Sequence, residues 1–186
     1  MSRCCGTNRL VTDNKPVVMI TGANAGIGRA TAHGLAQRGA AVIMACRNMT
    51  AAKTAAQDIC RTTGNDAVRC VEIDLADLAS VQRCAANVAA DGVDVLINNA
   101  GGAFPTRGFT AQGFEQTFGV NYLGPYALTR VLLPHMSGAP RVINVSSLGH
   151  RYCRGVGVSP VKLATCMPDT IIPGVLPPKT VNRPKY

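Results

Sequence analysis

A glycine-rich loop between an apolar run and an alanine-rich stretch constrains the fold of this chain more than any other segment. The run Val17–Thr21 is apolar and leads directly into the loop Thr21–Gly28, which reads TGANAGIG. Glycine allows a tight turn at Gly22, a close approach of backbone to a phosphate at Gly26, and close packing of a helix on a strand at Gly28. The helix that follows would present unpaired N–H groups and its positive dipole end to an anion. This succession of strand, loop and helix indicates a dinucleotide-binding unit.

The rest of the chain alternates short apolar runs with longer helix-like stretches. Strands are predicted at Val17–Thr21, Ala41–Ala45, Val68–Ile73, Val93–Ile97 and Arg141–Val145. Helices are predicted at Ile27–Arg38, Thr50–Arg61, Leu78–Ala90 and Gly113–Leu133. Strands that alternate with helices in this way form a parallel sheet through right-handed crossovers, with helices on both faces. We therefore predict an α/β fold with a doubly wound parallel sheet in three layers.

The residues after the second predicted strand bear on which dinucleotide binds. A chain that prefers NAD usually carries an acidic residue about 20 residues after the loop, where it holds the ribose 2′-hydroxyl. This chain carries Arg47 there, followed by Asn48. A guanidinium stays ionised and donates hydrogen bonds in a planar fork, which suits a 2′-phosphate. The sequence therefore favours NADP, and Arg29 is a second candidate for the positive charge that would attract the 2′-phosphate. The alternative for both arginines is a solvated helix or loop residue.

Three motifs, taken in order, resemble a known family. The motif NNAG at Asn98–Gly101 follows the fourth predicted strand, and NVSS at Asn144–Ser147 ends the fifth. With the glycine-rich loop they resemble the short-chain dehydrogenase/reductases over about residues 16–151. The segment Gly113–Leu133 and the run VSSLGHR resemble the retinol dehydrogenase branch and the related WW-domain-containing oxidoreductases. The resemblance implies a Rossmann-like fold and an NADP(H)-dependent oxidoreductase that interconverts an alcohol and a carbonyl on an apolar substrate, such as a retinoid, steroid or lipid.

The resemblance also implies roles for individual residues. Asn121 matches the asparagine of the family's catalytic tetrad, which lies at a local helix distortion and holds a water in the proton relay. Ser147 matches the serine that hydrogen-bonds the substrate oxygen. No metal ligand is expected. The implied cofactor-binding residues all follow predicted strands: Gly22, Asn24, Gly26, Ile27, Gly28, Arg47, Asn48, Asp74, Leu75, Asn99, Ala100 and Gly101.

Three of these assignments have a structural alternative. Asp74, expected at the adenine, could instead cap the helix that follows. Asn121 could be a polar residue inside a helix whose side chain is satisfied by backbone. Ser146 and Ser147 are adjacent, so strand register decides which of them faces the site, and the family pattern favours Ser147.

The family's acid/base pair has no counterpart in the 186 residues. In the family a Tyr exchanges the proton, and a Lys four residues later on the same helix face lowers the Tyr pKa. Tyr152 is followed at that spacing by Val156, and Tyr186 is the last residue. Tyr126 does have Arg130 four residues on, but it precedes the serine strand. We therefore expect a chain truncated before the Tyr-Lys helix, without appreciable turnover by itself.

A fold that is incomplete in its C-terminal half has two expected consequences. The strand Arg141–Val145 would be an uncovered edge with an exposed apolar face, and the folded state would be marginal. The alternative function is a catalytically silent module that binds the cofactor or forms a dimer. In the family the helix matching Gly113–Leu133 commonly contributes to the dimer interface, so a homodimer through this helix is an open alternative.

The formal net charge of +9 is unevenly distributed. Residues 1–150 contain 13 basic and 9 acidic residues, whereas residues 151–186 contain 6 and 1, together with six of the eleven prolines. We expect a flexible segment over residues 1–15, an NADP-binding domain over residues 16–150, and a basic, Pro-rich loop or tail over residues 151–186. Because the basic residues form no helical stripe with aromatic residues, no nucleic-acid partner is expected.

The eight cysteines include no CxxC pair of the kind that binds zinc. We interpret them as buried free thiols of a reducing compartment, and we expect the cytoplasm. The first residues lack the apolar run of a signal peptide, and no run reaches the length of a membrane span. Membrane association stays open, because Cys4 and Cys5 beside Arg3 are candidates for acylation.

Overall fold

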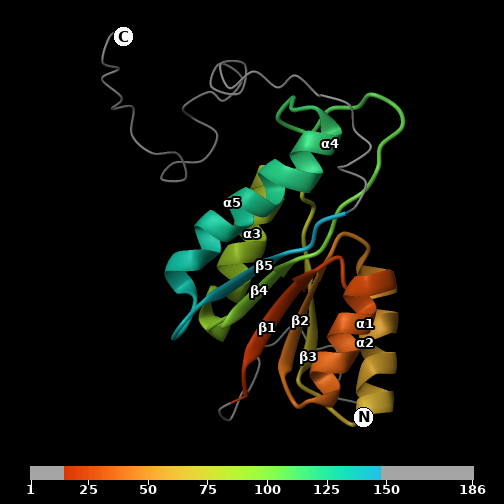
Figure 1. Cartoon of the computed structure of the whole chain (residues 1–186), viewed down its shortest axis with the longest axis vertical. Coiled ribbons are helices and arrows are strands. Elements are labelled where there is room, and N and C mark those ends of the chain that lie inside the picture. Colours follow the sequence, from red (N-terminus) through yellow and green to blue (C-terminus); the bar gives the residue numbers. More distant parts are fainter. Residues whose placement is uncertain (1–14, 148–186) are drawn as a thin grey trace.

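Five parallel strands form the centre of the molecule in the computed structural model, which describes residues 15–147 (Figure 1). Their order across the sheet is β3-β2-β1-β4-β5. The chain starts in the middle of the sheet, builds outward to β3, and then returns to the other side of β1. This is a doubly wound sheet, so the predicted fold class is confirmed. The strands are β1 (Val17–Thr21), β2 (Ala41–Cys46), β3 (Val68–Glu72), β4 (Val95–Asn98) and β5 (Arg141–Asn144).

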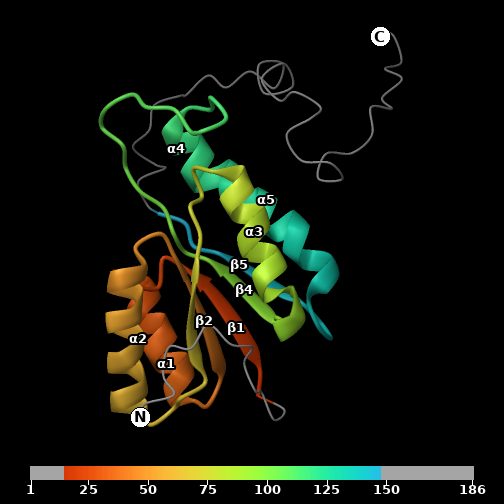
Figure 2. The same ribbon diagram turned by 180° about the vertical axis from the view of Figure 1, so that it is seen from behind.

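Helices cover both faces of this sheet. Figures 1 and 2 show α1 and α2 together on one face and α3 and α5 on the other. The helices on the first face are α1 (Gly26–Gln37) and α2 (Met49–Thr63), and those on the second are α3 (Leu78–Val88) and α5 (Gly124–Leu132). A single 3-10 turn, Ala89–Asp91, follows α3, and another, Leu133–His135, follows α5.

The alternation of apolar side chains along the strands builds a separate core on each face. In β1, Met19 packs into the core beneath α3 and α5, whereas Ile20 packs into the core beneath α1 and α2, and both side chains are fully buried. Small residues of α1, such as Ala32 and Ala36, allow that helix to lie close to the sheet. Apolar strands buried on both sides are expected in a parallel sheet. Because the five strands run parallel, their carboxyl ends all lie at one edge of the sheet.

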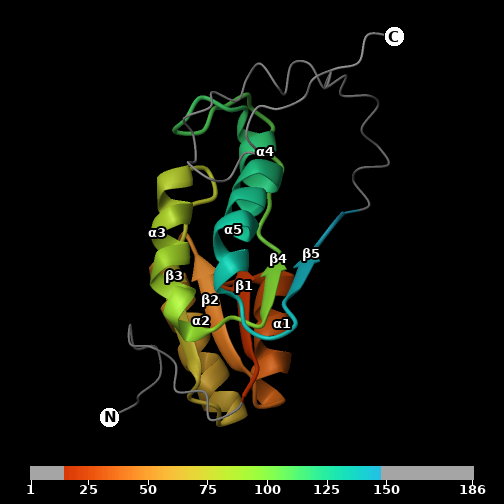
Figure 3. The ribbon, with the colours of Figure 1, turned by 90° about the vertical axis from the view of Figure 1, so that its left-hand side faces the viewer.

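The prediction of one regular helix over Gly113–Leu133 was wrong in two respects: the helical run starts later, and it is interrupted by a π turn. The helical run begins as α4 (Gln116–Phe118), because Gly113 has a positive φ of 81° and the Glu115 carboxylate caps the N–H groups of Thr117 and Phe118, both at 2.8 Å. A π-helical turn over Gly119–Leu123 then leads into α5. Figure 3 shows α4 and α5 as one run beside β4. The expected distortion at Asn121 is therefore present, since that residue lies in the π turn.

Strand β5 lies at one edge of the sheet, as expected. Its residue Ile143 is 46% exposed, and Val145 just beyond it is 45% exposed. The segments predicted as a flexible terminus and as a basic tail lie outside the described residues, apart from residue 15, and so do Tyr152 and Tyr186. Among residues 15–147, no helix combines the length and the apolar character that crossing a membrane requires.

Candidate functional site

The glycine-rich loop connects β1 to α1 at the edge of the sheet where the strands end. Gly22 has a positive φ of 69°, and its N–H donates to the Ala45 carbonyl at the end of β2, at 2.8 Å. A Cβ at Gly28 would lie 2.5 Å from both the Gly22 carbonyl oxygen and the Asn99 Nδ2. The loop, the start of α1 and the end of β4 are thus closer together than any larger residue allows.

Hydrogen bonds between β1 and β4 fix the other wall of the site. The Thr21 hydroxyl accepts from the N–H groups of Asn99 and Ala100, each at 3.0 Å. In return the Asn99 side-chain amide donates to the Thr21 carbonyl at 2.9 Å. The NNAG segment therefore joins the two central strands at the point where the winding of the sheet reverses, which is the usual ligand-binding position in open α/β sheets.

A cleft of about 640 Å³ opens along this edge of the sheet. It is lined by all twelve residues that the resemblance assigned to the cofactor: Gly22, Asn24, Gly26, Ile27, Gly28, Arg47, Asn48, Asp74, Leu75, Asn99, Ala100 and Gly101. Sequence reasoning missed six further lining residues: Ala25, Ala45, Cys46, Ile73, Phe104 and Val120. Four of the six are immediate neighbours of motif residues, so a wider window around each motif would have found them.

The end of β2 supplies the basic residue of the cleft. Arg47 is exposed, and Asn48 uses its side-chain oxygen to cap α2, accepting from the Ala51 N–H at 3.0 Å. Arg47 therefore projects from a short link between a buried strand and a capped helix, which fixes its backbone. An acidic side chain at this point would repel a 2′-phosphate, whereas the guanidinium attracts one.

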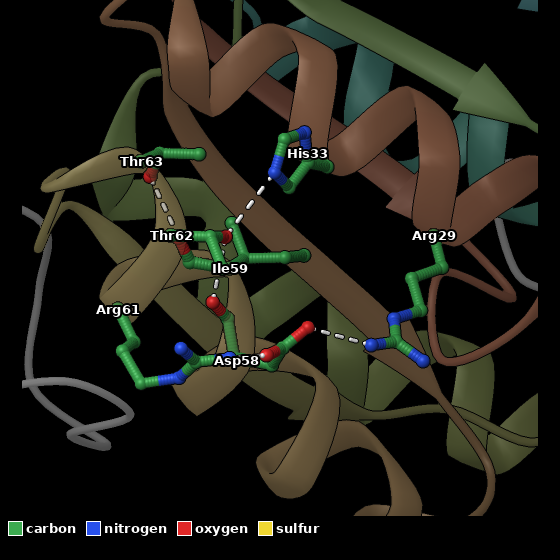
Figure 4. A network of polar contacts seen from close by, with 7 residues as sticks. All are labelled: Arg29, His33, Asp58, Ile59, Arg61, Thr62 and Thr63. Atoms are coloured by element: carbon green, nitrogen blue, oxygen red, sulfur yellow. Dashed lines mark hydrogen bonds and ion pairs between the residues drawn. The ribbon is translucent and has the colours of Figure 1, made fainter.

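Arg29 is held elsewhere. Figure 4 shows its guanidinium directed from α1 toward Asp58 of α2, where Nη2 lies 2.7 Å from Oδ2. Arg61 pairs with the second oxygen of the same carboxylate. Arg61 and Arg29 hydrogen-bond this carboxylate and hold the pKa of Asp58 below its usual value. Arg29 is not among the residues that line the cleft, so the structure favours the alternative of a helix-surface residue.

Asp74 lies in the cleft but also stabilises its own turn. Its carboxylate accepts from the Ala76 N–H at 2.9 Å, and its N–H donates to the Ser80 hydroxyl at 3.0 Å. The cap of α3 is Asp77, whose carboxylate accepts from the Ala79 N–H at 3.0 Å. The alternative that Asp74 itself caps this helix is therefore wrong.

Cys46 places a thiol in the wall of the cleft. The residue is buried at the end of β2, and the N–H groups of Ala23 and Asn24 in the glycine-rich loop donate to its sulfur. Burial raises the pKa of the Cys46 thiol, and these amides partly offset that shift. A buried neutral thiol contributes packing to the site rather than a nucleophile.

Asn121 does not line this cleft, although its neighbour Val120 does, and it lines a second cavity instead. Its side-chain oxygen accepts from the Gly102 N–H at 2.9 Å, and its side-chain nitrogen donates to the Gly102 carbonyl at 2.8 Å. The π turn gives Asn121 this position, so the side chain joins the turn to the loop after β4. The alternative, a polar residue within a helical run whose side chain is satisfied by backbone, agrees with these bonds, since Asn121 lies in the π turn and both partners are backbone atoms of Gly102. The catalytic role stays a prediction.

The two serines of NVSS follow β5. Ser146 lines a second cavity of about 410 Å³, together with Asn121 and Tyr126. Ser147 is exposed, is the last residue that the structure describes, and does not line this cavity, so Ser146 is the serine beside Asn121 here. On the floor of this cavity the Asn98 side-chain amide donates to Asn144 Oδ1 at 2.9 Å and to the Thr129 hydroxyl at 3.1 Å. The serine segment thus comes close to Asn121 where β4 and β5 end.

Comparisons with known proteins agree with this geometry. Residues 16–158 match the family profile of the short chain dehydrogenases. The chain belongs to this family. Retinol dehydrogenase 11 of Homo sapiens is 45% identical over 142 residues, which are 74% of this chain and 45% of that protein. Retinol dehydrogenase 13 of Mus musculus is 47% identical over 137 residues, 72% of this chain and 41% of that protein. This short-chain dehydrogenase chain therefore spans less than half the length of these relatives.

Solved structures share this fold. A protein from Mycobacterium paratuberculosis is 45% identical with a TM-score of 0.66, over 76% of this chain and 49% of that one. An alcohol dehydrogenase of the archaeon Thermococcus sibiricus, solved with 5-hydroxy-NADP, is 26% identical with a TM-score of 0.63, over 72% of this chain and 59% of that one. The resemblance seen in the motifs is therefore confirmed at the level of the family and its fold.

Proposed function

We propose that this chain binds NADP(H) in the 640 Å³ cleft and serves the interconversion of an alcohol and a carbonyl on an apolar substrate. The observation that carries the proposal is the pairing of a glycine-rich loop at the start of α1 with an exposed arginine, Arg47, at the end of β2. The loop and helix suit a pyrophosphate, and the arginine suits a 2′-phosphate. The likeness to retinol dehydrogenases supports a retinoid among the apolar substrates expected from the sequence.

The residues fit a dinucleotide along the edge of the sheet. Asp74 and Arg47, after β3 and β2, would hold the adenosine end, and the loop Gly22–Gly28 would hold the pyrophosphate. Residues after β4, such as Gly101, would then hold the nicotinamide end. When bound, the nicotinamide supplies or accepts the hydride of the reaction.

This chain's own residues would orient the reactants. By the family resemblance Ser147 would hydrogen-bond the substrate oxygen, with Ser146, which lines the second cavity, as the alternative, and Asn121 would hold the loop after β4 through Gly102. No Tyr in the 186 residues is followed by Lys at the fourth position, so the polypeptide by itself offers no counterpart to the family's proton donor. We infer that it binds the cofactor without turnover at ordinary enzymatic rates.

A titration with NADPH and NADH tests the proposal. We expect the wild-type chain to bind NADPH more tightly than NADH, and binding to raise its thermal stability, because a ligand of the native state alone stabilises that state. Arg47→Gln should remove the preference for NADPH. Arg29→Gln is the matched control, since Arg29 is paired with Asp58, and it should keep the preference. Equal affinity of the wild-type chain for both nucleotides would contradict the NADP assignment.

A second candidate function is association with another copy through the helical run Gln116–Leu132. On this run Tyr122 is 55% exposed and stacks on Tyr126, with ring centroids 6.3 Å apart. Leu133, just after α5, is 41% exposed. Large exposed apolar side chains on one helix favour an interface. Sedimentation velocity tests this function: a dimer that Tyr122→Ser disrupts would support it, and a monomer at all concentrations would contradict it.

The buried thiols support a reducing compartment. Cys46 and Cys84 are free and buried, and neither belongs to a disulfide. We propose the cytoplasm or the reducing face of a membrane as the location.

A further inference from the structure

Two buried glycines bound the π turn between α4 and α5. The N–H of Gly124 closes the turn by donating to the Gly119 carbonyl. At each glycine an added side chain would meet another segment of the chain. A Cβ at Gly119 would overlap Thr110 Cγ2, and a Cβ at Gly124 would lie 2.5 Å from the Leu75 carbonyl oxygen. The π turn is therefore packed between the loop after β4 and the segment after β3.

The contact at Gly124 involves main chain as well as a side chain. A Cβ there would also lie 2.9 Å from Leu75 Cβ and 3.1 Å from Leu75 Cα. A side chain can turn away from an added methyl group, whereas a backbone carbonyl moves only with the segment that carries it. Because a Cβ does not come closer than about 3.0 Å to another heavy atom, Gly124→Ala must open the distance to the carbonyl oxygen from 2.5 to at least 3.0 Å.

The helix is the better anchored of the two partners in this contact. Ala127, Leu128 and Leu132 of α5 are fully buried in the core beneath that helix. Moving α5 would disturb this close-packed core, which has little room to adjust. We therefore expect the segment that carries Leu75 to take up most of the displacement.

The same segment forms part of the cofactor cleft. Asp74 and Leu75 line the cleft, and the next residues are held by the loop after β4. The Ala111 N–H donates to the Ala76 carbonyl at 3.2 Å, and the Gln112 side chain donates to the Asp77 carboxylate at 3.0 Å. The wall of the cleft after β3 therefore rests on the helical run and on the loop that precedes it.

We propose that Gly124 is a positioning residue for the adenosine end of the bound dinucleotide. The absence of a side chain at Gly124 lets α5 lie against the Leu75 backbone, and this contact fixes the wall that Asp74 and Leu75 give to the cleft. The inference rests on the proposed function, because it requires the cleft to hold NADP(H) with its adenosine end beside Asp74. Groups that bind a ligand must be held within about 0.5 Å of their productive positions, so the displacement forced by Gly124→Ala should weaken binding.

The experiment measures the affinity for a whole ligand and for its adenosine end. Dissociation constants are determined by calorimetry for NADPH and for adenosine 2′,5′-bisphosphate, which lacks the nicotinamide half. We expect Gly124→Ala to weaken both ligands by the same factor, on the order of tenfold, because the disturbed wall contacts the half that the two ligands share. Circular dichroism verifies that the variant is folded at the temperature of the titration.

Gly119→Ala is the matched control, because it adds one methyl group at the other buried end of the same π turn. Its clash is with Thr110, which is not among the described residues that line the cleft. The variant should lose stability but bind both ligands as the wild type does. Adding Thr110→Ser removes the obstructing methyl group and keeps the hydroxyl that accepts from the Phe114 N–H at 3.1 Å, so the double variant should regain stability.

If Gly124→Ala does not fold, amide hydrogen exchange in the wild-type chain decides. Saturating adenosine 2′,5′-bisphosphate should slow exchange over residues 119–127, because a ligand that steadies Leu75 also steadies the helix start packed against it. Strand β5, at the opposite edge of the sheet from β3, should exchange at an unchanged rate. An unchanged rate over residues 119–127 in the saturated chain would overturn the inference.

Three results with folded variants would also overturn it and leave the proposed function intact. Gly124→Ala could bind both ligands as the wild type does. Gly119→Ala could weaken both ligands as much as Gly124→Ala, which would make the effect a general distortion of the π turn. Gly124→Ala could weaken NADPH alone, which would assign the loss to the nicotinamide end. A wild-type chain that binds neither ligand would instead refute the proposed function, and the inference with it.

Discussion

The side-chain amide of Asn121 and the backbone of Gly102 form a closed pair of hydrogen bonds, in which each residue both donates and accepts, at 2.8 and 2.9 Å. This pair joins the π turn of the helix to the loop after β4. A regular α-helix would rotate the residues after Gly119 away from this position. The distortion of the helix is thus what allows the side chain to reach the loop.

We expect Asn121→Ala to lower the free energy of unfolding by about 1–2 kcal/mol, because two hydrogen bonds are lost. Asn121→Asp should cost at least as much, since its carboxylate can accept from the Gly102 N–H but sets a second, negatively charged oxygen against the Gly102 carbonyl oxygen. Urea unfolding followed by circular dichroism measures both values. Arg130→Ala, at an exposed position of α5, serves as the control and should be close to neutral. A stability loss in Asn121→Asp that is clearly smaller than in Asn121→Ala would contradict this account of the pair.

Close packing at Gly28 leads to a second prediction. Because a Cβ there would lie 2.5 Å from Asn99 Nδ2 and from the Gly22 carbonyl oxygen, Gly28→Ala must displace the loop or the end of β4. We expect a loss of about 1–3 kcal/mol of stability and the loss of measurable dinucleotide binding.

Gly34→Ala on the same helix is the matched control for Gly28. Within residues 15–147 and apart from the backbone of α1 itself, a Cβ at Gly34 would meet only the Arg38 Nη1 within 4 Å, at 3.5 Å. This variant should gain roughly 0.5–1 kcal/mol from helix propensity and keep its affinity for the nucleotide. Thermal shift with and without NADPH measures both effects. If both alanines behaved alike, the packing of the loop would not depend on Gly28.

The fold and most of the cleft could be predicted from the sequence because their signals are local. Strands buried on both faces read as apolar runs, and the residues of the site follow those strands directly. Arg47 is an example: its position relative to the loop depends only on the parallel register of β1 and β2, in which Thr21 pairs with Ala45.

Other features depend on contacts between distant segments and carry no local signal. The ion pair that directs Arg29 away from the cleft is with Asp58, which is 29 positions away in the sequence. The loop that carries Phe104 is shaped by bonds such as that from the Ala111 N–H to the Ala76 carbonyl, at 3.2 Å. The apolar spacing of Gly113–Leu133 continues through the π turn, so the sequence pattern alone does not reveal where the α-helix is interrupted.

A buried ion pair between β3 and the turn after α3 gives a third prediction. Arg69 and Asp91 are 4% and 2% exposed, with Nη2 and Oδ2 2.5 Å apart. Asp91→Ala should cost about 3–5 kcal/mol, because it leaves a buried guanidinium without its carboxylate. Replacing both residues, as Arg69→Met with Asp91→Leu, should recover most of that loss. Urea unfolding of the two single variants and the double variant measures the coupling between them.

The exposed cluster of Figure 4 provides the control for this ion pair. Asp58→Ala also removes a carboxylate that pairs with arginine, but Arg29 and Arg61 remain in contact with water. That variant should change stability little, since exposed ion pairs are screened and their side chains regain freedom. A comparable loss in Asp58→Ala and Asp91→Ala would show that burial is not the cause.

The Cys84 thiol gives the last prediction, which concerns alkaline pH. Burial on the inner face of α3 raises the pKa of Cys84 from 9.0 to about 12, with the nearby Arg69 acting in the opposite direction. The folded chain therefore keeps the thiol protonated at pH values where the unfolded chain ionises it. The stability linked to this proton is fully present below pH 9 and is lost as the pH rises toward about 12, by up to roughly 1.4 kcal/mol per pH unit.

Cys84→Ala should cost stability at pH 7 through the cavity it leaves, but its curve of stability against pH should fall less steeply above pH 9, so that the curves of the variant and the wild type converge. Parallel curves across that range would show that the thiol ionises equally in both states.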